Sequence, residues 1–151
     1  INGGTSSNII ANEVKLSGTV RSFSPAVRDK MANRLEEVSK AAAAVYGAEC
    51  EFEYRRCTPA VINCPEETDM LRQAVSQIFG QEALHGLEKT TGGEDFAWFL
   101  ERIPGSYVRI GASAAAEGKN WPHHHERFDV DEEALVNGAA VLCQTALMFG
   151  R

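Results

Sequence analysis

The fold class rests on residues 13–47, which read EVKLSGTVRSFSPAVRDKMANRLEEVSKAAAAVYG. At the start of this stretch apolar and polar residues alternate, which is the pattern of a half-buried strand with one wet face. Ser24 and Pro25 then provide a capping hydroxyl and a proline for the first helical position, so a helix is expected to begin there. Apolar residues recur at helical spacing up to about Tyr46, and Gly47 is a natural end for the helix.

A second alternating segment follows the helix at residues 49–56 and also predicts a strand with one wet face. Together with the strand expected at 13–23 and the helix between them, it makes a small α+β unit. The helix is expected to turn an apolar stripe inward. The members of this stripe are Val27, Met31, Leu35, Val38, Ala42 and Val45.

Residues 57–64 form a connector, which contains Pro59 and Asn63 and marks the expected boundary between two parts of the chain. Beyond it helices and strands alternate, as they do in part of an α/β domain. The elements expected there are a helix from Pro65 to about Phe79, a short strand near 83–87, a short helix around Phe96–Leu100, a buried strand at 107–112 and a last helix from about Asp129 or Asp131 to Phe149.

Composition is that of an ordinary globular protein, with 44% hydrophobic and 24% charged residues among 151. The formal net charge of −6 argues against nucleic acid or an anionic membrane surface as a partner. No apolar run approaches the roughly 20 residues that a membrane span needs, and no signal peptide is evident. Because the sequence begins with Ile1 rather than Met, we expect a cut through a longer chain.

The four cysteines, Cys50, Cys57, Cys64 and Cys143, form no Cys-x-x-Cys pair, so a structural zinc site is not expected. They suit the reduced, partly buried thiols of a cytoplasmic protein. Cys57 and Cys64 could pair across a short loop, which leaves one disulfide as the alternative interpretation.

The densest polar cluster lies in a long loop expected at 113–128 and reads WPHHHERFD from Trp121 to Asp129. Its three adjacent histidines cannot all chelate one ion in one local conformation, because neighbours on an extended segment point in opposite directions. Imidazole suits zinc, manganese, iron and nickel. From spacing alone a metal-binding loop and a solvated histidine loop are both open.

Two further clusters could line a site. Residues 90–96 read TTGGEDF, where the glycines allow close backbone approach and the acidic pair suits the first turn of a helix. Asn8 is expected in a loop and Arg21 on the polar face of the first strand, where its guanidinium could grip a carboxylate bidentately. Each cluster also has an ordinary explanation, as a capped glycine loop or as a surface arginine with a turn asparagine.

Taken together and in order, these motifs resemble one family, the metallopeptidases and amidohydrolases that include aminoacylases, hippurate hydrolases, auxin-conjugate hydrolases and glutamate-type carboxypeptidases. The resemblance covers essentially the whole chain, and its strength lies in the order of motifs that are individually weak. The motifs are Ile1-Asn2-Gly3-Gly4-Thr5-x-x-Asn8-Ile9-Ile10, Gly18-Thr19-Val20-Arg21-Ser22-Phe23, Gly92-Gly93-Glu94-Asp95-Phe96-Ala97-x-Phe99-Leu100 and His124-x-x-x-Phe128-Asp129.

The resemblance implies a protein of two domains, in which a smaller lid domain that often dimerises interrupts the catalytic domain. Residues 1–62 would then be a partial ferredoxin-like lid whose first helix and strand are missing. Residues 63–151 would be the C-terminal segment of an α/β catalytic domain of the zinc-exopeptidase type. The N-terminal half of that catalytic domain, with most metal ligands and the glutamate general base, would lie outside this chain.

The resemblance also implies roles for particular residues. The family holds one or two divalent ions, usually zinc, manganese or cobalt, and His124 matches its last histidine ligand because it stands four residues before Phe128-Asp129. The flanking His123 and His125 are not assigned as ligands.

The other motif residues would face the substrate. Asn8 matches a lid asparagine that reaches over the substrate, and Arg21 matches a lid arginine that holds its terminal carboxylate. The loop containing Gly92, Gly93 and Glu94 would shape the cleft near the metals without binding them.

The implied activity is hydrolysis of the amide bond of N-acyl amino acids or small peptides with a free carboxylate, by a metal-activated water. This chain alone is expected to be inactive, because one histidine is fewer than the three protein ligands of a typical catalytic zinc. The expected partners are a small-molecule substrate and a second copy bound through the lid. The alternative is a non-catalytic dimerisation or ligand-binding module derived from this family.

Overall fold

The computed structural model describes residues 1–113, 118 and 120–150, and their contacts divide the chain into two units, Ile1–Ala60 and Val61–Arg151. Each unit is described by itself. Among the described residues, no helix combines the length and the apolar character that crossing a bilayer requires.

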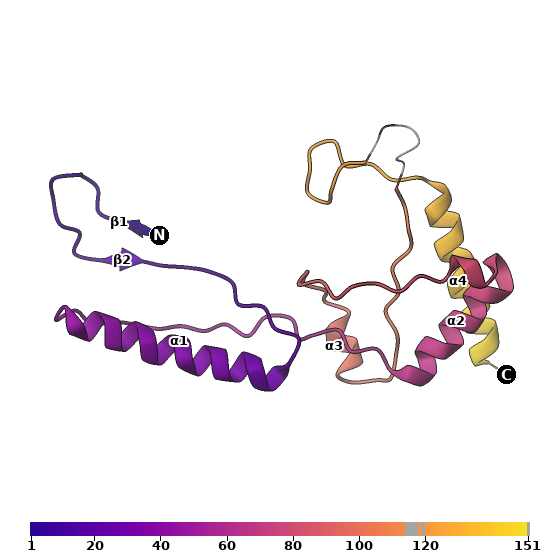
Figure 1. Ribbon diagram of the computed structural model, residues 1–151, viewed down its shortest axis with the longest axis horizontal. Helices are drawn as coiled ribbons and strands as arrows, with labels where there is room; N and C mark the ends of the chain where they lie inside the picture. The colour runs from indigo at the N-terminus through magenta and orange to yellow at the C-terminus, as the bar shows by residue number, and fades with distance from the viewer. Residues whose placement is uncertain (114–117, 119, 151) are drawn as a thin grey trace. The chain divides into compact units, whose positions relative to one another are not determined.

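The first unit pairs a minimal sheet with one long helix (Figure 1). Strands β1, Asn2–Gly3, and β2, Val14–Lys15, run antiparallel, with Asn2 opposite Lys15 and Gly3 opposite Val14. Helix α1 spans Pro25–Val45. A positive φ of 69° at Gly47 lies just beyond its end, a backbone conformation that glycine adopts without strain.

The start of α1 follows from its local sequence. The Ser24 hydroxyl accepts a hydrogen bond from the backbone N–H of Val27 at 3.4 Å, and Pro25 occupies the first helical turn. The same end of the helix is tied to the following segment, because the Arg28 guanidinium donates to the Cys57 carbonyl at 2.7 Å and Asp29 pairs with Arg56. The helix predicted to begin at Ser24-Pro25 and to run to about Tyr46, before Gly47, is therefore confirmed at both ends.

The strands of this unit differ from the prediction. The strand expected at 13–23 is reduced to Val14–Lys15, and residues 49–56 are extended without a strand partner among the described residues. Their burial still alternates, since Cys50, Phe52 and Tyr54 are half-buried. A strand is completed only by the hydrogen bonds of a neighbour, so the alternation marks a strand whose ladder is not formed within the described chain.

The apolar stripe of α1 is also not where the pattern placed it. All six of its members are exposed, the five larger ones at 49% for Val27, 38% for Met31, 40% for Leu35, 49% for Val38 and 77% for Val45. The buried position on α1 is Ala32, which belongs to another face of the helix. The prediction that the stripe faces inward is therefore wrong for this chain, because none of the described chain covers it.

The second unit is built on two helices that pack side by side, α2 (Pro65–Phe79) and α4 (Glu133–Phe149) (Figure 1). Ala74 of α2 and Val141 of α4 are buried, and the Gln144 carboxamide of α4 donates to that of Gln77 at 2.6 Å. A 3-10 turn, η1, covers Gln81–Ala83, and the short helix α3 covers Ala97–Leu100. The predicted helices are confirmed here, with α4 beginning a turn later than expected.

The strands expected in the second unit are not formed. The segment expected as a strand near 83–87 starts with the end of η1, and residues 107–112 have no strand partner among the described residues. Val108 and Ile110 are 43% and 41% exposed, so the prediction of a buried strand is wrong as well. Burial of this segment requires neighbouring strands on both sides, which the described chain does not supply.

Helix α4 is apolar on all sides. Apart from Glu133 it carries no charged residue, and the side turned away from α2 exposes large apolar side chains. A helix of this kind is normally surrounded by protein. The exposed members are Leu135, Val136, Leu142, Leu147 and Phe149, between 64% and 76% exposed.

Candidate functional site

The glycine loop at residues 90–96 is shaped by the side chain of Glu94. Its Oε1 accepts a hydrogen bond from the backbone N–H of Phe96 at 3.1 Å, just before α3 begins. The Tyr107 hydroxyl donates to the same carboxylate and is the largest cause of the lowered pKa of Glu94, followed by the Phe96 amide. The pKa of Tyr107 is raised in turn, first by this hydrogen bond and then by burial.

A second connection reaches the beginning of the same loop. The Arg109 guanidinium donates to the Thr90 hydroxyl at 2.9 Å, and its positive charge contributes a smaller part of the lowered pKa of Glu94. The loop is thus attached to residues 107–109 at both of its ends, and its glycines Gly92 and Gly93 lie between the two attachments.

Asn63 holds Tyr107 in place from the other side. Its carboxamide donates to the Tyr107 carbonyl and accepts from the Tyr107 amide, each at 2.9 Å, as a neighbouring strand would do. Sequence reasoning assigned roles to Gly92, Gly93 and Glu94 but missed Asn63, Tyr107 and Arg109. The available signal was the polar side shared by Tyr107 and Arg109, which stand two apart in a segment predicted to be extended.

The three imidazoles of the histidine loop differ in their contacts. The His125 ring stacks on Trp121 at 4.3 Å between centroids and its Nδ1 accepts from the Arg127 amide at 3.1 Å, while the His123 ring meets Phe128 edge-on at 4.9 Å. His124 is exposed and has a positive φ of 68°. Its ring makes no hydrogen bond, ion pair or ring contact with the residues that the structure describes, so both nitrogens remain open to a ligand.

The described residues do not form a complete metal site. Nowhere in the described ranges do three or more His, Cys, Asp or Glu side chains gather as a metal ion would require. Nor does any described hydrogen bond, ion pair or ring contact join His124 to Gly92, Gly93 or Glu94. Within the described residues His124 is therefore a single open imidazole rather than a member of a ligand set, and a metal held here would need donors from elsewhere.

Asn8 and Arg21 lie in the first unit. Asn8 stands in the turn between β1 and β2, where its carboxamide oxygen accepts from the Ser6 hydroxyl at 2.7 Å. Arg21 is exposed on the extended segment that leads to α1. A shallow hollow of about 450 Å³ opens beside the β1–β2 turn and is lined by residues such as Thr5 and Ile9.

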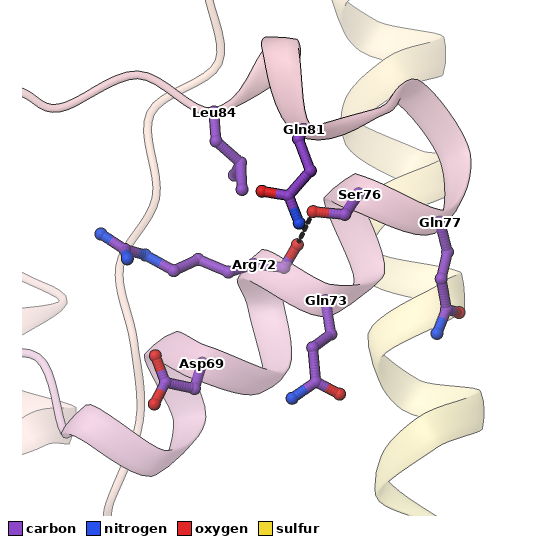
Figure 2. A pocket seen from close by; sticks show the side chains of 7 residues that line it. All are labelled: Asp69, Arg72, Gln73, Ser76, Gln77, Gln81 and Leu84. Carbon is purple, nitrogen blue, oxygen red and sulfur yellow. Dashed lines mark hydrogen bonds between the residues drawn. The ribbon is translucent and has the colours of Figure 1, made fainter.

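Another hollow, of about 420 Å³, lies along the outer side of α2 (Figure 2). Most of its side chains are polar and spread along α2, among them Asp69, Arg72 and Gln73, while Gln81 of η1 and the apolar Leu84 line its end. The hydroxyl of Ser76 is occupied by its own helix, since it donates to the Arg72 carbonyl at 2.8 Å. This hollow contains none of the residues predicted from the sequence, and its groups do not converge on a point.

Comparison with solved structures identifies the class of protein. The chain matches the crystal structure of the Bacillus subtilis YXEP protein, described as a dinuclear metal binding peptidase from the M20 family, with a TM-score of 0.84 and 31% identity. The match covers 98% of this chain and 40% of that one. The two units therefore have the fold of part of such a peptidase.

The family follows from the sequence. The model of Peptidase family M20/M25/M40 matches residues 2–148, and the chain belongs to this family. Among curated relatives, a probable hydrolase of Synechocystis sp. is 36% identical over 99% of this chain and 38% of its own length. An N-acetylcysteine deacetylase of Bacillus subtilis is 33% identical over 98% of this chain and 37% of its own length. The chain thus spans less than two fifths of the length of these relatives.

Proposed function

We propose that this chain is the C-terminal portion of a metal-dependent amidohydrolase that cleaves the amide bond of N-acyl amino acids or small peptides with a free carboxylate. The observation that carries the proposal is the family match over residues 2–148. The deacetylase among the relatives and the peptidase among the solved structures favour amide bonds next to an amino acid.

In this proposal His124 is a metal ligand. Its imidazole is exposed and open, whereas the rings of His123 and His125 are engaged by Phe128 and Trp121. Zinc and manganese both accept imidazole, and one or two such ions in the working enzyme would lower the pKa of a bound water. Because the described residues do not complete a metal site, we assign no reaction step to them beyond this ligand.

Asn8 and Arg21 are proposed to bind the substrate. Arg21 is exposed, and a guanidinium matches the two oxygens of a terminal carboxylate. Asn8 stands in a turn, with its carboxamide nitrogen directed to no acceptor among the described residues. Residues Gly92, Gly93 and Glu94 would shape the cleft.

We further propose that residues 1–62 form part of a lid and residues 63–151 part of the catalytic domain, in a cytoplasmic enzyme that dimerises through the lid. The exposed stripe of α1 and the exposed side of α4 support the view that more protein surrounds both units. The lid's first helix and strand, and the catalytic domain's N-terminal half, would supply that cover. Residues 1–151 alone would then hydrolyse no substrate.

A direct test compares residues 1–151 with a longer polypeptide that includes the preceding coding sequence. Each is purified, supplied with zinc or manganese, and assayed for release of amino acid from N-acetyl and N-benzoyl amino acids. We expect hydrolysis by the longer polypeptide and none by residues 1–151. Hydrolysis by residues 1–151 would refute the assignment as an inactive portion, and inactivity of both would favour the second candidate.

The second candidate is a non-catalytic dimerisation or ligand-binding module. The observation in its favour is that the described residues contain no group of three metal-binding side chains. Light scattering of residues 1–151 tests whether this module is a dimerisation module, which would form a stable dimer. Either form of the module also requires that the longer polypeptide hydrolyses no substrate.

A further inference from the structure

The glycine loop has two attachments that come from one short segment. Tyr107 reaches Glu94 at the end of the loop, and Arg109 reaches Thr90 at its beginning, at 2.9 Å. In an extended segment residues two apart point to the same side, so both side chains can serve one loop without distorting the backbone.

The segment that bears these two side chains is itself held. Both polar ends of the Asn63 carboxamide bind the backbone of Tyr107 at 2.9 Å, and the Tyr107 ring lies 5.8 Å from the ring of Phe96. The Phe96 amide in turn binds Glu94 at 3.1 Å. Tyr107 therefore connects a fixed backbone position to the end of the loop through its ring and its hydroxyl.

The centre of the loop has no comparable steric constraint. A Cβ added at Gly92 would meet only the Thr90 hydroxyl, at 3.9 Å, so the space around it is open. Because glycine without close neighbours can adopt many backbone conformations, the loop has a single shape only if other contacts restrict it. The attachments at Thr90 and Glu94 restrict the backbone on both sides of the two glycines.

We propose that Tyr107 and Arg109 are positioning residues that fix the conformation of the glycine loop at 90–96 by holding Thr90 and Glu94, on either side of its two glycines. The effect on substrate turnover rests on the proposed function: the two residues would act on turnover through the loop, without touching the substrate. The attachment of the loop is a property of residues 1–151 and is measurable in them.

The first experiment is nuclear magnetic resonance on residues 1–151, with the variants Tyr107→Phe and Arg109→Met. Tyr107→Phe keeps the ring beside Phe96 and removes only the hydroxyl. In Tyr107→Phe the Phe96 amide keeps Glu94 as its acceptor, but Glu94 loses the hydrogen bond that holds it, so we expect Phe96 amide exchange to rise by up to about fivefold, the equilibrium factor of one ordinary hydrogen bond. In both variants we expect the Gly92 and Gly93 amides to become more mobile. The matched controls are Tyr54→Phe, in the other unit, and Arg102→Met, on an exposed position near α3.

A spectroscopic readout separates this role from general packing. The phenol of Tyr107 is followed by its ring carbon signals as pH is raised, and Glu94→Gln is expected to lower its pKa because the carboxylate is the main cause of the raised value. The ring signals of Tyr46, in the other unit, are the internal reference. Unchanged Phe96 exchange in Tyr107→Phe, together with an unchanged Tyr107 titration in Glu94→Gln, would overturn the proposal.

The second experiment measures kinetics in the longer polypeptide. Tyr107→Phe and Arg109→Met are expected to lower kcat about tenfold or more, with a smaller change in KM, because a misplaced cleft loop acts mainly on the reacting geometry. If that polypeptide hydrolyses no substrate, the proposed function fails, while the exchange and titration results still decide the positioning role. Kinetics equal to those of the unaltered enzyme would reject Tyr107 and Arg109 as positioning residues.

Discussion

At the scale of single residues, Glu94 carries a measurable pH dependence. The Tyr107 hydroxyl, and after it the Phe96 amide, hold the pKa of Glu94 below its usual range. A lowered folded-state pKa means that the stabilisation is present above the unfolded-state pKa and is lost as pH falls through the folded-state value. The loop attachment should therefore be complete at neutral pH and disappear in acid.

Glu94→Gln tests this expectation, because glutamine keeps the shape and cannot lose a proton in this range. The chemical shift of the Phe96 amide is recorded from pH 7 down to about pH 2.5, below the ordinary glutamate pKa. We expect an acid transition in the unaltered chain and in the control Glu88→Gln, and none in Glu94→Gln. An identical transition in Glu94→Gln would show that another group titrates.

The contribution of the same hydrogen bond to stability changes with pH in the opposite direction on the alkaline side. Because the pKa of Tyr107 is raised, its contribution is present below the ordinary tyrosine value near 10 and is lost as pH rises through the higher folded-state value. The loop should hence detach in strong alkali as well as in acid.

The site residues differ in how far sequence could reach them. Glu94 and His124 could be identified from the sequence, because each lies in a short local motif and the motifs follow one another in the order typical of the family. The partner of Glu94 is Tyr107, whose contact depends on the path of the chain between them and on the backbone bonds to Asn63. Long-range contacts of this kind have no local pattern, which is why the network was not predicted.

At the scale of elements, the cap of α1 makes a definite prediction. Ser24→Ala removes the hydroxyl that accepts from the Val27 amide and should reduce the free energy of unfolding of the first unit by about 1 kcal/mol. Urea unfolding followed by circular dichroism measures the change. Ser24→Asp restores an oxygen acceptor and should recover most of the loss, whereas an equal loss in both variants would rule out the cap as its cause.

Helix α4 allows a comparison of its two sides. Val141→Ala removes apolar volume from the buried contact with α2 and should lower stability by about 2 kcal/mol in residues 1–151. Leu142→Ala changes a side chain that is 68% exposed and should cost under about 0.5 kcal/mol there. In the longer polypeptide Leu142→Ala should become as costly as Val141→Ala, as seen by denaturant unfolding. A small cost in both settings would show that this side is not covered.

Helices and strands were predictable to different degrees for a physical reason. Helices α1 and α2 carry their own signals, such as Ser24-Pro25 and the Gly80 that follows Phe79, and their hydrogen bonds close within the element. The segments at 49–56 and 107–112 alternate or are apolar in sequence, yet a strand needs a partner, and the described chain provides none for them. Local pattern fixed their extended form and not their pairing.

At the scale of the whole molecule, the exposed surface is larger than two folded bodies need. The chain exposes 12692 Å². Two separate compact bodies of about these masses would expose roughly 9,000 Å² in total. Apolar faces on α1 and α4 contribute to this excess, together with exposed apolar side chains elsewhere such as Ile10 and Phe99. The excess agrees with a chain that spans less than two fifths of its relatives.

The most direct test of the account is amide hydrolysis by the longer polypeptide with His124→Ala. Activity toward N-acetyl amino acids is measured with zinc or manganese supplied, beside His85→Ala, an exposed histidine outside the loop. Loss of a ligand should lower kcat/KM at least about a hundredfold, since even outer partners of metal ligands are worth tenfold to a hundredfold. His85→Ala should behave like the unaltered enzyme. Full metal-dependent activity in His124→Ala would contradict the assignment of His124 as a metal ligand.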